Sequence, residues 1–163
     1  MNPIHPALAP LARAAKEMPY HDVAPVLKQA LADRSWLRAE HRVGDPTRYM
    51  RHLLYVDPDD DFVITAIIWL PGQKSPVHGH YVWCAFGVVE GELTEETFRA
   101  PGDLLELVGS RLIRTAELAD IDLGGPMYHR VSNQTQKPLV TLHAYGVAAD
   151  RLTTGINRFY AEA

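Results

Sequence analysis

From Tyr49 onward the sequence is a succession of short β-branched and aromatic runs, each bounded by turn residues. Asp57-Pro58, Pro71-Gly72 and the two-residue turn Glu90-Gly91 are the clearest of these boundaries. Such runs favour β-strands. We interpret as strands residues 51–56, 62–70, 83–89, 92–98, 104–108, 112–115, 128–132 and 139–147. Many short strands with frequent turns predict a closed or double-sheet β architecture.

Before Tyr49 the hydrophobic pattern is helical. Asp22 is placed to cap a helix with Pro25 in its first turn, an earlier helix is expected to end before Pro19, and Ser35 to cap a short third helix. The stripe that predicts the middle helix comprises Val23, Val26, Leu27, Ala30 and Leu31. We therefore expect a single domain over 1–163, with N-terminal helices in 1–45 and a β-barrel in 46–163.

Charge and composition exclude several classes of protein. The formal net charge of −4 gives no basic footprint for nucleic acid, and no apolar run approaches the ~20 residues of a membrane span. Residues 1–10 do not resemble a secretion signal. The single cysteine, Cys84, rules out an internal disulfide framework and favours a reducing, cytoplasmic location. A monomer or small homo-oligomer is expected.

Histidines supply the strongest chemical signal. His78 and His80 are two residues apart, so on a strand both imidazoles point to the same face. His129 follows on a later predicted strand that a barrel could bring alongside. Three imidazoles suit iron, zinc or copper and leave coordination positions open for substrate. Taken alone, the pair fits a solvated strand face equally well.

The surrounding residues resemble two cupin motifs. Gly72 to His80, followed by Gly91, is similar to the first motif, and His129 with Pro126 and Asn133 is similar to the second. Cys84 stands where the usual cupin pattern has a glutamate ligand. A three-histidine set without that carboxylate resembles the cysteine dioxygenase family of thiol dioxygenases, in its bacterial type. The resemblance implies a mainly β fold, the cupin double-stranded β-helix or jelly-roll barrel, with a short N-terminal helical segment.

Two further segments resemble the same family. Thr141, His143 and Tyr145 alternate on one strand face and match a Ser-x-His-x-Tyr relay, in which the tyrosine lies beside the reacting groups. Tyr49 and Arg51 match a Tyr-x-Arg segment whose arginine binds the substrate carboxylate. Without the resemblance, the relay reads as a buried hydrogen-bonded pair and the arginine as a surface residue.

The resemblance implies a specific activity. Iron, Fe(2+), held by His78, His80 and His129 would oxidise the thiol of a small thiol-carboxylate with O2, with L-cysteine to cysteine sulfinic acid as the first choice. 3-Mercaptopropionate and mercaptosuccinate remain alternative substrates. A non-catalytic metal-binding cupin and a zinc isomerase or hydrolase are alternatives of other classes; for the latter, candidate carboxylate bases are Glu90, Glu92 and Asp122.

Other expectations concern individual residues around this site. In animal-type relatives a cysteine at the place of Cys84 forms a thioether with the active-site tyrosine, which implies a Cys84–Tyr145 crosslink; a small buried cysteine is the alternative. The spacing from His80 to Cys84 is one residue shorter than in those relatives, and Gly79 replaces a frequent aspartate. Arg151 and Arg158 are candidates for a second carboxylate contact.

Overall fold

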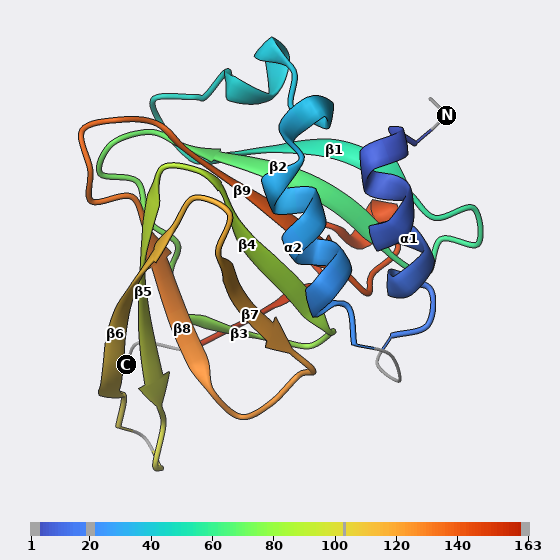
Figure 1. Ribbon diagram of the computed structural model, residues 1–163. Coiled ribbons are helices and arrows are strands. Elements are labelled where there is room, and N and C mark those ends of the chain that lie inside the picture. The colour runs from blue at the N-terminus through green and yellow to red at the C-terminus, as the bar shows by residue number, and fades with distance from the viewer. Residues whose placement is uncertain (1–3, 19–21, 103, 161–163) are drawn as a thin grey trace.

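The computed structural model describes residues 4–18, 22–102 and 104–160. Two five-stranded antiparallel sheets face each other, and helices cover the outer side of one of them (Figure 1). The first sheet has the order β1-β2-β9-β4-β7 and the second β10-β3-β8-β5-β6. The first comprises β1 (Met50–Val56), β2 (Val63–Trp69), β9 (Leu139–Tyr145), β4 (Cys84–Glu90) and β7 (Leu118–Asp122). The second comprises β10 (Asn157–Phe159), β3 (His78–His80), β8 (Tyr128–Ser132), β5 (Glu92–Arg99) and β6 (Glu106–Arg114).

The central strands of the first sheet, β2, β9 and β4, are buried on both faces, which explains their nearly continuous apolar sequences. In β2, Ile64 and Ile68 pack in the cluster beneath the helices, whereas Val63, Ile67 and Trp69 pack in the interior between the sheets. Every residue of β2 is buried. The interior face of this sheet is therefore an apolar surface against which polar side chains can be positioned.

Two helices cover the outer face of the first sheet. α1 (Ala9–Ala15) and α2 (Ala24–Ala32) bury Leu11, Leu27 and Leu31 among the outward residues of the sheet. A Cβ atom on Gly87 of β4 would lie 2.4 Å from Cδ1 of Leu31 and 2.6 Å from the Glu117 carbonyl oxygen, and the fixed backbone oxygen makes glycine necessary there. Short 3₁₀ turns at Pro6–Leu8, Arg34–Trp36, Ala39–Arg42 and Ala149–Arg151 complete the connections. No helix among the described residues is long and apolar enough to cross a bilayer.

The mainly β fold with N-terminal helices is confirmed, with differences at individual elements. Residues 104–108 and 112–115, predicted as two strands, belong largely to one strand, β6, which continues through Gly109. β7 and β10 were not predicted. Asp22 accepts a hydrogen bond from the Ala24 amide (2.9 Å), but the N-cap residue of α2 is Val23, one position later than predicted. Ser35 is not a cap: its amide donates to Asp33, which caps the turn (3.0 Å). α1 ends at Ala15, as expected, while Pro19 lies outside the described residues.

Candidate metal centre

The three predicted ligand histidines meet between β3 and β8. His78 and His129 lie directly opposite each other in the antiparallel pairing of these strands, and His80 shares the face of His78. Nε2 of His78 lies 3.2 Å from Nε2 of His129. One nitrogen from each of the three imidazoles falls within 4.8 Å of the others. The register of two short strands therefore builds a three-nitrogen cluster.

The remaining ring nitrogen of each histidine is engaged on the outer side of the cluster. In all three, Nδ1 lies 2.8–2.9 Å from an oxygen acceptor. The acceptors are the Pro76 carbonyl for His78, the Asp122 carboxylate for His80 and the Glu95 carboxylate for His129. A proton on Nδ1 satisfies each contact and leaves the Nε2 lone pair free for a metal. The donor set therefore fits a divalent transition metal.

The pKa values of His78 and Asp122 favour cation binding at this cluster. Burial, reinforced by the neighbouring His129, lowers the pKa of His78 to about 3, so its imidazole is neutral at physiological pH. Burial raises the pKa of Asp122, but contacts with His80 and the amides of Gly125 and Gly124 outweigh it and hold that pKa at about 2. A neutral imidazole at His78, with carboxylates behind His80 and His129, favours a bound cation.

Gly79 between the two histidines has a local cause. A Cβ atom there would lie 2.7 Å from both Nη2 of Arg158 and the Met127 carbonyl oxygen. The Arg158 guanidinium lies over the Tyr128 ring, 4.3 Å from its centroid, and donates to the Gly125 carbonyl. Arg158 therefore occupies the outer side of β3 and is not among the residues that line the cavity beside the histidines; nor is Arg151.

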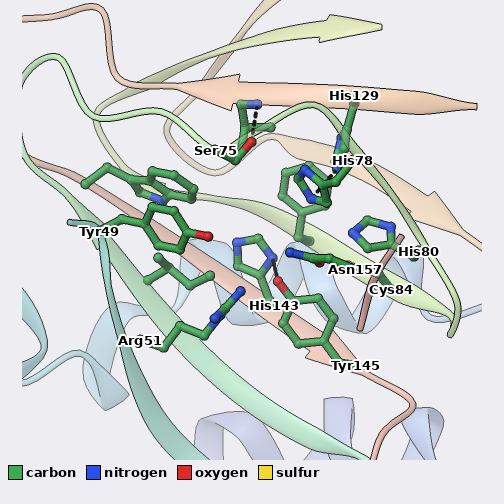
Figure 2. Close-up of a pocket in the computed structure, with 14 residues that line it drawn as sticks. Tyr49, Arg51, Ser75, His78, His80, Cys84, His129, His143, Tyr145 and Asn157 are labelled. Carbon is green, nitrogen blue, oxygen red and sulfur yellow. Dashed lines mark hydrogen bonds between the residues drawn. The ribbon is translucent and has the colours of Figure 1, made fainter. Parts of the chain in front are cut away.

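The histidine cluster opens into a cavity that contains the predicted substrate residues (Figure 2). Tyr49 and Arg51 lie across this cavity from the histidines. The Tyr49 ring stacks on Trp69 with centroids 4.3 Å apart, and Cζ of Arg51 is 5.5 Å from the Tyr49 centroid. The buried Nε of Arg51 has no hydrogen-bond partner among the described residues. A guanidinium with an unused buried donor beside a cavity is a binding group for an anion.

The predicted relay on β9 is hydrogen bonded from end to end. The Tyr145 hydroxyl lies 2.8 Å from Nδ1 of His143, whose Nε2 lies 2.8 Å from Oγ1 of Thr141. The Trp69 indole N–H, which can only donate, donates to the same Oγ1 at 3.0 Å. Burial lowers the pKa of His143 and raises that of Tyr145, so both are neutral. The relay fixes the Tyr145 hydroxyl at the cavity.

Cys84 lines the same cavity from β4. It is 1% exposed and stands opposite Tyr145 in the β4–β9 pairing. Burial raises the pKa of its thiol, which therefore stays protonated in the free protein. The structure thus brings together nine of the residues singled out from the sequence, with Thr141 behind the cavity wall: Tyr49, Arg51, His78, His80, Cys84, His129, Thr141, His143 and Tyr145.

Sequence reasoning missed four residues of this region. Glu95 reads as part of the polar stretch Thr94 to Thr97, although its alternation with Leu93 places it on the buried face. From the sequence, Asp122 is a candidate only for a carboxylate base. Its contact with His80 is not expected, because β7 is not predicted. Asn157 lines the cavity from β10, opposite His80 in the sheet register. Trp69 was read only as a strand residue. The short, charged strands β7 and β10 carry no strong hydrophobic signal.

Comparison with known proteins gives a family and a fold. The family model described as "Cysteine dioxygenase type I" matches residues 16–154. Among solved structures, a Thermus thermophilus protein aligns with TM-score 0.53 and 17% identity, over 66% of this chain and 91% of that one. An uncharacterized conserved protein with a double-stranded β-helix domain from Klebsiella pneumoniae aligns with TM-score 0.50 and 18% identity, over 68% and 86%. A cupin superfamily protein from Desulfitobacterium hafniense aligns with TM-score 0.50 and 10% identity, over 64% and 83%. The barrel is therefore a cupin double-stranded β-helix.

Proposed function

The chain belongs to the cysteine dioxygenase type I family, and we propose that it is an iron-dependent thiol dioxygenase that converts L-cysteine to cysteine sulfinic acid. The observation that carries the proposal is one shared cavity. Three imidazoles able to hold a metal face it from one side, and the Arg51 guanidinium faces it from the other. A small molecule with a thiol at one end and a carboxylate at the other matches both groups at once.

His78, His80 and His129 would hold ferrous iron through Nε2. Ferrous iron, when bound, supplies the redox chemistry: it favours the thiolate form of the substrate and activates dioxygen. Both oxygen atoms end on sulfur, so the thiol R–SH and O2 give the sulfinic acid R–SO2H. Sulfur supplies all four electrons that dioxygen takes up, and no other reductant is needed.

Arg51 and Tyr49 would bind the substrate carboxylate. The guanidinium offers a planar pair of donors that matches a carboxylate, and the stack of Tyr49 on Trp69 holds the neighbouring phenol in place. Anchoring one end of a short substrate fixes where its sulfur lies relative to the histidines. The resemblance of Tyr49 and Arg51 to the carboxylate-binding segment of cysteine dioxygenases favours cysteine as the substrate over 3-mercaptopropionate.

Tyr145 would contact the reacting groups, with His143 and Thr141 holding its hydroxyl in position. The surrounding walls are apolar: Ile67, Phe86 and Val131 line the same cavity. Phe86 stacks on His143 with centroids 4.8 Å apart, which fixes the imidazole plane. Apolar walls around the fixed Tyr145 hydroxyl would limit the access of water to a partly oxidised sulfur.

Metal content of histidine variants tests the ligand set directly. We expect His78→Ala, His80→Ala and His129→Ala each to lose most of the iron bound by the wild-type protein. His52→Ala is the matched control, because His52 lies on β1 and contacts the Val43 carbonyl, away from the cavity. Full iron content in any of the three ligand variants would remove that histidine from the set.

A further inference from the structure

The two carboxylates behind the histidines are themselves rigidly held. Glu95 is 2% exposed; its Oε1 lies 2.8 Å from Nδ1 of His129, and its Oε2 accepts a hydrogen bond from Arg111 at 2.7 Å. Asp122 is arranged in the same way. Its Oδ2 lies 2.9 Å from Nδ1 of His80, and its Oδ1 accepts from the backbone amides of Gly124 (2.8 Å) and Gly125 (3.0 Å). In each carboxylate, one oxygen contacts a histidine, and the other accepts hydrogen bonds that fix the orientation of the group.

The charge balance of the cavity gives these carboxylates a second role. Three neutral imidazoles bring no negative charge to a divalent cation, and the Arg51 guanidinium lines the same cavity. Close positive charge of this kind opposes binding of a cation. Glu95 contacts the imidazole of His129 and Asp122 that of His80. The imidazole of His78 contacts only a backbone carbonyl, that of Pro76. Two carboxylates therefore stand behind the ligand set, and Glu95 shares its negative charge with the Arg111 guanidinium.

We propose that Glu95 and Asp122 are positioning residues that hold His129 and His80 with Nε2 toward the metal and supply the negative charge that the ligand set lacks. The inference rests on the proposed metal site but not on the identity of the thiol. Outer partners of this kind commonly contribute 10- to 100-fold to metal affinity. The two residues lie on different strands, β5 and β7, so each can be tested without the other.

The chain offers a matched control for each residue. Glu96 follows Glu95 on β5 but points to the other side of the strand, where it pairs with Arg130 at 2.7 Å. Asp120 lies on β7 two residues before Asp122, and it accepts a hydrogen bond from the Ile121 amide and not from a histidine. Glu96→Gln and Asp120→Asn therefore remove a nearby charge without removing a histidine contact.

The test is the dissociation constant for Co²⁺, measured without oxygen by competition with a chelator, for the wild type and four variants. Glu95→Gln and Asp122→Asn keep side-chain size and should weaken Co²⁺ binding by about 10- to 100-fold each. Glu96→Gln and Asp120→Asn should change it by less than about threefold. The potential of the bound Fe(III)/Fe(II) couple should also become more positive in the first two variants, because the lost anion stabilised the higher charge.

Unchanged affinity and potential in both Glu95→Gln and Asp122→Asn would overturn the inference, as would an equal loss in the controls. If one of the two variants fails to fold, as judged by the unfolding transition of the metal-free protein, the other carries the test. Failure of the wild type itself to bind Co²⁺ or iron would instead overturn the proposed function.

Discussion

Cys84 on β4 lies directly opposite Tyr145 on β9, and both side chains line the cavity beside the three histidines. Residues paired in this way have Cα atoms about 4.5–5.5 Å apart, with side chains on the same face of the sheet. The one-residue shortening between His80 and Cys84 has therefore not moved Cys84 away from the tyrosine. The alternative of a cysteine that only packs predicts no reaction between the two.

This pairing leads to a prediction about a covalent bond. We expect repeated aerobic turnover with iron to join Sγ of Cys84 to a ring carbon of Tyr145, with two protons and two electrons passing to dioxygen, which is reduced to hydrogen peroxide. Intact mass should fall by two hydrogens, and peptide mapping should join the two segments. Cys84→Ser should abolish the mass change yet retain activity. Unchanged mass after many turnovers would leave Cys84 as a packing residue.

Arg51 should determine the requirement for a substrate carboxylate. Arg51→Ala should raise KM for cysteine by roughly 30- to 150-fold, the equivalent of about 2–3 kcal/mol for a lost charge-assisted pair, with iron content unchanged. Arg48→Ala, a change of an exposed arginine just before β1, is the control. Cysteamine, which lacks the carboxylate, should be a poor substrate; turnover equal to that of cysteine would contradict the role of Arg51.

The hydroxyl of Thr141 should matter more than its methyl group. Thr141→Val keeps the shape but leaves the buried Trp69 N–H and His143 Nε2 without their shared partner. We expect the free energy of unfolding to fall by about 1–3 kcal/mol and activity to drop, because Tyr145 is no longer held through His143. Thr141→Ser should preserve both. Denaturant unfolding and steady-state kinetics measure them, and equal behaviour of the two variants would refute the relay.

Acid should destabilise the metal-free protein partly through His143. Burial holds the pKa of His143 well below its ordinary value, so the folded state keeps it neutral while the unfolded state takes up a proton below about pH 6.5. Its contribution to stability is therefore complete above that pH and is lost progressively as pH falls. His143→Gln should reduce the slope of unfolding free energy against pH by up to about 1.4 kcal/mol per unit. Parallel pH profiles for variant and wild type would exclude this explanation.

The sequence was sufficient for the fold class because most strands carry strong apolar patterns. β2 and β9 read as strands from their β-branched runs, and the positions of His78, His80 and His129 follow from a period of two along each strand. Strands at the edges of the sheets are harder to predict from the sequence. Gly109 and Ser110 look like a turn, yet β6 continues through them because it lies at the edge of its sheet, where exposed residues cost little.

The side chains that contact the site could be predicted from the sequence only where they belong to a recognisable motif. Glu95 and Asp122 act through strand pairings that bring β5 beside β8 and β7 beside β4, and no local pattern reports such pairings. Asn157 reaches the cavity because β10 pairs with the histidine strand β3 at the end of the described chain. Long-range register decides these contacts, so the three-dimensional structure was needed to find them.

The central claim, oxidation of a thiol to a sulfinate by both atoms of dioxygen, is tested most directly with isotope-labelled oxygen. Protein loaded anaerobically with ferrous iron would be mixed with cysteine and ¹⁸O2, and the product examined by mass spectrometry alongside oxygen uptake. We predict cysteine sulfinic acid carrying two labelled oxygen atoms, with one dioxygen consumed for each sulfinate formed. Cystine with hydrogen peroxide as the products, or no oxygen uptake by the iron-loaded protein with any thiol-carboxylate, would contradict the account.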